Sequence, residues 1–146
     1  MSPKGAQHEA LKILLNRLFH RLLSDDIFVA PETTFRMADD TYLEPDFVFY
    51  PESVGPVGLN TGNVRLVIEI ADSSLDFDLG HKAAVYAAFG IPELWVINAK
   101  TYQTTIHRTP SPLGYRSIRM IAETDFLEAA FVPDLILSLS NLDLPE

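Results

Sequence analysis

Apolar residues recur at helical spacing near the start of the chain. Between His8 and Leu23 the leucines fall every three or four positions and form one stripe, which predicts an amphipathic helix. Shorter apolar runs follow from Ile27 to Ala30 and from Thr33 to Met37, and each has the length of a strand. A further β-rich run extends from Asp46 to Tyr50. The first part of the chain is therefore predicted to form a helix followed by short strands.

Two continuous apolar runs enclose a helical pattern in the middle of the chain. Arg65–Ala71 is apolar at nearly every position, which is typical of a strand covered on both faces. A helix is predicted from Asp76 to Phe89, and Gly90 with Pro92 after it indicates its C-terminal stop. The run Leu94–Asn98 predicts another strand. A strand, a helix and a strand in this order make a right-handed βαβ unit with parallel strands.

The remaining segments complete a mixed sheet. Thr104–Arg108 and Arg116–Ile121 alternate between apolar and polar residues, which predicts an antiparallel hairpin, and Leu135–Leu139 predicts a last strand. Pro51–Gly62, rich in proline and glycine, is predicted to be a surface loop. The pattern indicates an α/β fold, a mixed β-sheet flanked by helices, in one domain that spans residues 1–146.

Composition narrows the classes of protein. Apolar residues make up 47% and charged residues 21% of the chain, as in ordinary globular proteins. The absence of cysteine excludes disulfides and thiolate zinc sites, and it favours a cytoplasmic location. No apolar run is long enough for a membrane span. The formal charge of −9 weighs against loose nucleic-acid binding, because such binding requires a surplus of lysine and arginine facing phosphates.

Two carboxylates interrupt predicted strands. Glu69 lies inside the apolar run Leu66–Ile70, where a buried carboxylate is costly unless a cation or strong donors meet it. The alternatives are that this strand lies at a sheet edge, or that Glu69 pairs with Arg65. Asp46 opens another apolar strand directly after Pro45. Taken alone, this aspartate could equally be a turn or cap residue.

Lys82 is the third residue that departs from its local pattern. At about 100° per residue, it falls in the middle of the apolar arc of its helix. The arc consists of Leu79, Ala83, Tyr86 and Phe89. We therefore expect Lys82 to point at the sheet, although an exposed ion pair with Asp78 remains an alternative.

These three residues make chemical sense as one site. Carboxylates of Asp46 and Glu69 on neighbouring strands would form a hard-oxygen site for Mg²⁺ or Mn²⁺, and the carbonyl of Ile70 is a candidate third ligand. Such a metal polarises a phosphodiester and lowers the pKa of a bound water. Lys82 beside it would orient that water or stabilise developing charge.

Longer motifs resemble those of the Uma-two family, restriction-endonuclease-like proteins of bacteria with a PD-(D/E)XK nuclease fold. The resemblance rests on the stretches 66–74, 78–82 and 90–97, together with Tyr86 and the closing segment Phe131–Leu135. In this comparison Pro45-Asp46 resembles the PD motif and Glu69 the acidic motif residue. Lys82 resembles the lysine that in this family has moved from the strand to the following helix. Ala71 stands where the superfamily signature would place lysine.

The resemblance implies a Mg²⁺-dependent endonuclease that hydrolyses DNA, with Asp46, Glu69 and Lys82 as catalytic residues. A catalytically silent module with the same fold, binding protein or nucleic acid, is the alternative, and the net charge favours it. His8 matches a family position on the first helix. We also expect a homodimer, because nucleases of this superfamily often work as dimers. Its contact would form through Phe126–Phe131 or a sheet edge.

Overall fold

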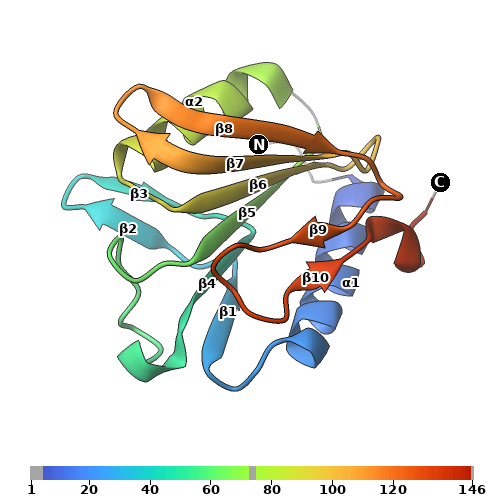
Figure 1. Ribbon diagram of the computed structural model, residues 1–146, viewed down its shortest axis with the longest axis horizontal. Helices are drawn as coiled ribbons and strands as arrows, with labels where there is room; N and C mark the ends of the chain where they lie inside the picture. Colours follow the sequence, from blue (N-terminus) through green and yellow to red (C-terminus); the bar gives the residue numbers. More distant parts are fainter. Residues whose placement is uncertain (1–4, 73–74, 146) are drawn as a thin grey trace.

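A six-stranded mixed sheet with a helix on each side forms the framework (Figure 1). The structure is a computed structural model that describes residues 5–72 and 75–145, without the side chains of residues 75–79. The helices are α1 (Ala6–Leu22) and α2 (Leu75–Ala88). In spatial order the strands are β1 (Ile27–Pro31), β4 (Phe47–Pro51), β5 (Leu66–Ala71), β6 (Glu93–Asn98), β7 (Thr104–Ser111) and β8 (Gly114–Ile121). The predicted α/β class with a mixed sheet and flanking helices is confirmed.

The predicted βαβ unit lies at the centre of this sheet. β5 and β6 pair in parallel and α2 connects them, whereas the other neighbouring strands of the sheet pair antiparallel. The helix ends as its sequence indicates: Gly90 has φ 76°, and its N–H donates to the carbonyl of Ala87. The next N–H, of Ile91, donates to the carbonyl of Tyr86. These two bonds make a Schellman cap, which fixes the last turn of α2.

Both faces of β5 are buried, which explains its continuous apolar sequence. Ile68 belongs to a core cluster with Leu15 and Phe19 of α1, whereas Val67 belongs to a second cluster with Tyr86 of α2. Because side chains alternate along a strand, the two clusters lie on opposite faces of the sheet. Any polar residue at an odd-numbered position of β5 must therefore point toward α2.

Two small hairpins lie outside the main sheet and differ from the predictions. The run predicted as Thr33–Met37 forms β2 (Phe35–Ala38). It pairs with β3 (Thr41–Leu43) in a separate two-stranded sheet, and the sequence pattern does not indicate β3. The predicted strand Leu135–Leu139 shortens to β10 (Ile136–Leu137), which pairs with β9 (Leu127–Glu128). Single turns of 3-10 helix cover Glu52–Val54 and Leu139–Asn141. In the described part of the chain, no helix combines the length and apolar character needed to cross a membrane.

A buried carboxylate ties the C-terminal segment to the sheet. Glu93 is fully buried and accepts hydrogen bonds from Trp95 Nε1 at 2.8 Å and Arg108 Nε at 3.0 Å. Its other oxygen accepts from the backbone N–H of Ala130 at 2.9 Å. Arg108 also donates to the carbonyl of Glu128. Charge and hydrogen bonds are thus satisfied together, as a buried ion requires.

Candidate active site

Strand pairing brings two carboxylates together on the α2 face of the sheet. β4 pairs antiparallel with β5, with Phe47 opposite Ile68, so the same register continued by one residue places Asp46 opposite Glu69. The two residues are only 6% and 5% exposed. The edge-strand alternative is wrong, because β5 lies between β4 and β6.

Glu69 is held by two residues of α2. The hydroxyl of Tyr86 donates to its Oε2 at 2.7 Å, and Nζ of Lys82 lies 3.5 Å from its Oε1. Lys82 thus points at the sheet as expected, with its side chain 39% exposed. The alternative partner Asp78 lies outside the described side chains. The guanidinium of Arg65 instead donates to the carbonyl of Phe131.

Asp46 is also held from two directions. Its Oδ2 accepts the backbone N–H of Ile70 at 2.7 Å, and its Oδ1 lies 3.5 Å from Nε2 of the buried His8 on α1. The N–H and C=O of one residue in an extended strand point the same way. The carbonyl of Ile70 therefore faces the Asp46 side of β5, whereas that of Ala71 accepts from Ala99 beyond β6.

The surroundings of Asp46 and Glu69 disfavour negative charge on Glu69. Burial raises the pKa of the Glu69 carboxyl, and the neighbouring charge of Asp46 raises it further, whereas Lys82 and Tyr86 lower it. Burial and the adjacent carboxylate likewise raise the pKa of the Tyr86 hydroxyl, so this group stays protonated and donates. A divalent cation placed between the carboxylates would remove most of the cost of their charge.

The donor set fits a magnesium or manganese ion. Two carboxylates and one carbonyl are hard oxygen ligands, and Mg²⁺ in proteins is often bound by one or two carboxylates while it keeps several waters. No group of three or more histidine, cysteine, aspartate or glutamate side chains suited to a metal occurs among residues 5–72 and 80–145. Nδ1 of His8 is buried without a hydrogen-bond partner, although Oε1 of Glu9 lies 3.7 Å away.

Two polar contacts of this site were missed in the sequence. The spacing places Tyr86 in the apolar arc of its helix, and such a pattern does not distinguish a tyrosine that donates from a phenylalanine that only packs. Nothing in the local pattern of His8 indicates contact with Asp46. A polar atom on an otherwise apolar helix face was the available signal for both.

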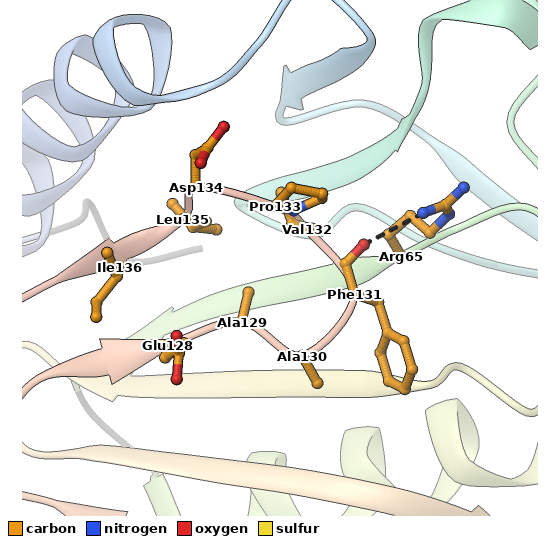
Figure 2. Close-up of a pocket in the computed structure, with 10 residues that line it drawn as sticks. All are labelled: Arg65, Glu128, Ala129, Ala130, Phe131, Val132, Pro133, Asp134, Leu135 and Ile136. Atoms are coloured by element: carbon orange, nitrogen blue, oxygen red, sulfur yellow. Dashed lines mark hydrogen bonds between the residues drawn. The ribbon is translucent and has the colours of Figure 1, made fainter.

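A separate hollow of about 540 Å³ lies at the other end of β5 (Figure 2). The segment from Glu128 to Ile136 curves around it, and Arg65, directly before β5, completes its lining. None of the predicted site residues lines this hollow. Its size alone does not connect it with phosphodiester chemistry.

Comparisons with known proteins agree with the fold described above. The family model Uma2, described as "Putative restriction endonuclease", matches residues 1–140. No curated protein matches the chain significantly. Among solved structures, a "putative nuclease belonging to DUF820" from Anabaena variabilis superposes with a TM-score of 0.75 at 14% sequence identity. The superposition covers 97% of this chain and 82% of that one. At this identity the likeness establishes the nuclease fold alone.

Proposed function

We propose, on the premise that the chain belongs to the Uma2 family of restriction-endonuclease-like proteins, that it is a metal-dependent endonuclease hydrolysing DNA phosphodiester bonds. The observation that carries this proposal is the meeting of Asp46, Glu69 and Lys82 from three separate elements. Buried carboxylates beside a partly exposed ammonium are expensive to maintain, and structural stability gains little from them.

Each residue has a proposed role. Asp46, Glu69 and the carbonyl of Ile70 would hold Mg²⁺ or Mn²⁺. When bound, the metal would supply Lewis-acid polarisation of the phosphate and a more acidic water. Lys82 keeps part of its side chain in solvent, so its ammonium can face both the carboxylates and an incoming phosphate. The ammonium would orient the attacking water and stabilise negative charge on the phosphate oxygens.

A catalytically silent binding module is the second candidate, and the net charge of −9 favours it. Such a module would keep the fold and bind protein or nucleic acid without cleaving it. For either function we propose a cytoplasmic homodimer.

Replacement of Lys82 by methionine tests the enzyme. Lys82→Met keeps the apolar stem and removes the charge, so the fold should survive while cleavage of DNA falls by about 100-fold or more. Single-stranded, duplex and branched DNA should each be assayed with Mg²⁺ and Mn²⁺. Lys100→Met, at an exposed lysine in the turn after β6, is the matched control and should cleave like wild type.

Binding of metal separates the two candidates. Calorimetry of the wild type should detect Mn²⁺ binding that disappears in Glu69→Gln. Cleavage that persists in Lys82→Met would remove this lysine from the mechanism. A wild type that neither binds Mn²⁺ nor cleaves any of these substrates would favour the binding module.

A further inference from the structure

We propose that Tyr86 is a positioning residue, which orients the Glu69 carboxylate so that Oε1 is presented to the metal beside Lys82. This inference rests on the proposed metal site and assigns the residue that shapes it. Tyr86 would act only through Glu69, since its side chain is fully buried and cannot meet a substrate.

The two oxygens of Glu69 have different partners. Oε2 accepts the Tyr86 hydroxyl at 2.7 Å, whereas Oε1 lies 3.5 Å from the ammonium of Lys82. Only the first of these contacts has the length of a normal hydrogen bond. The short bond therefore fixes one oxygen, and the longer contact leaves the other available to a stronger cation.

Helix geometry makes this division possible. Lys82 and Tyr86 stand four positions apart on α2, so their side chains lie on the same face of the helix, one turn from each other. Both therefore reach a single carboxylate on the strand beneath. A carboxylate can otherwise rotate about its last bond, which has broad energy minima. Tyr86 at Oε2 and Lys82 near Oε1 together restrict the rotation of the Glu69 carboxylate.

The backbone of Tyr86 is fixed as well as its ring. Its carbonyl accepts the N–H of Ile91 at 3.1 Å in the cap that ends α2. Its side chain belongs to the buried cluster between α2 and the sheet, with Val67 and Leu94. The hydroxyl thus projects from a rigid element, which is what an orienting group requires. Partners that orient metal ligands typically contribute 10–100-fold to metal affinity or activity.

The test compares Mn²⁺ binding by three metal-free proteins in calorimetry: wild type, Tyr86→Phe and Tyr115→Phe. Tyr115 is the matched control, because it also belongs to the cluster under α2 and its buried hydroxyl donates to the carbonyl of Ile91 at 2.8 Å. Its replacement removes a hydroxyl of the same kind and weakens the contact at the helix cap, while the Glu69 hydrogen bond stays. Melting temperatures of both variants report that the fold persists.

We expect Tyr86→Phe to weaken Mn²⁺ binding by about tenfold or more, and Tyr115→Phe to change it less than about twofold. Wild-type affinity in Tyr86→Phe would overturn the inference while the metal site stands. Equal weakening in both variants would also overturn it, since the effect would then come from packing. A wild type that binds no Mn²⁺ would refute the proposed metal site itself, and Tyr86 would have no ligand to position.

Discussion

At the scale of single residues, Glu69 is buried where folding disfavours a charge, although the proposed chemistry requires one. It is 5% exposed on an interior strand, and burial outweighs the help that Lys82 and Tyr86 give to its charged form. A residue selected only for stability would be apolar here, like its neighbours Ile68 and Ile70. The cost of the charge should therefore be measurable in the metal-free protein.

Glu69→Gln should stabilise the metal-free protein at pH 8 and change its stability little near pH 4. The pKa of Glu69 in the folded state is raised above its ordinary value of 4.5, so the folded state prefers the protonated form. The stability that this protonated group contributes is complete at low pH and is lost as the pH rises through the folded-state pKa. Glutamine is neutral throughout, so it escapes that loss. The gain in stability should therefore be larger at pH 8 than any change measured near pH 4.

Urea unfolding in the presence of a chelator measures this difference at both pH values. Glu44→Gln, at an exposed glutamate before β4, is the control and should follow wild type at each pH. Added Mn²⁺ should reverse the order at pH 8, because only the wild type gains stability by binding metal to the folded state. A glutamine variant that is less stable than wild type at pH 8 would contradict the argument.

The sequence indicates those residues of the site that interrupt an apolar pattern. Glu69 breaks an apolar strand, and Lys82 breaks an apolar helix arc. The sequence signal for Asp46 is weaker, because an aspartate after proline is common in turns. Its place beside Glu69 depends on how β4 aligns with β5, which the sequence pattern does not give. Tyr86, His8 and Glu93 obey or only mildly disturb the pattern, so their roles depend on tertiary contacts that spacing does not encode. The catalytic roles assigned to Asp46, Glu69, Ile70 and Lys82 remain predictions.

At the scale of elements, α2 carries the two residues that contact Glu69 from the side opposite the strand. It connects the parallel strands β5 and β6, and its inner face delivers both Lys82 and Tyr86 to Glu69. The cap at Gly90 sets where the helix ends, and therefore where Tyr86 stands. Glycine is favoured there because its φ of 76° is a conformation that other residues rarely adopt.

Two glycines of this segment should respond in opposite directions to alanine. Gly90→Ala should destabilise the protein by about 1 kcal/mol, because the left-handed backbone disfavours a Cβ even though no atom lies within 4 Å of it. Gly80→Ala should stabilise it by about 0.5–1 kcal/mol, since Gly80 is exposed within the helix and its added Cβ would also meet open space. Thermal and urea unfolding of both variants measure these changes. Destabilisation by Gly80→Ala would show that the helix is not regular at this position.

Elements were predictable in proportion to their length. The apolar runs that predict β5 and β6 are each as long as a full strand. The helical spacing that predicts α2 extends over several turns. β3, β9 and β10 have two or three residues each, which is too short for any period to emerge. The run Leu135–Leu139 predicts one strand because apolar residues recur along it. In the structure the strand ends at Leu137, and Leu139 begins a turn of 3-10 helix.

At the scale of the whole molecule, a net charge of −9 must coexist with the polyanionic substrate that we propose. Each phosphate neutralised by lysine or arginine adds affinity, and the chain has only 11 such residues. Several of them, Arg36, Arg65 and Arg108 included, bind groups of the protein itself. A dimer would double the acidic as well as the basic side chains, so the charge balance gives no reason to expect association.

The exposed apolar side chains indicate where two chains would meet. Phe126 and Phe131, 65% and 46% exposed, flank β9. The edge strand β8 is less suited, since it carries Arg116 and Arg119 without an acidic residue, and self-pairing would bring like charges together. We therefore expect a homodimer formed through the Phe126–Phe131 segment.

Replacing both phenylalanines with serine should convert this dimer to a monomer. Light scattering after size-exclusion chromatography should give twice the mass of one chain for wild type and a single chain mass for the variant. Leu113→Ser is the control, because Leu113 is 100% exposed in the β7–β8 turn and its loss should leave the dimer intact. If wild type elutes as a monomer at high concentration, dimerisation through this surface is wrong. If the double variant remains dimeric, the contact lies elsewhere, and the unpaired edges of β1 and β8 are the next surfaces to test.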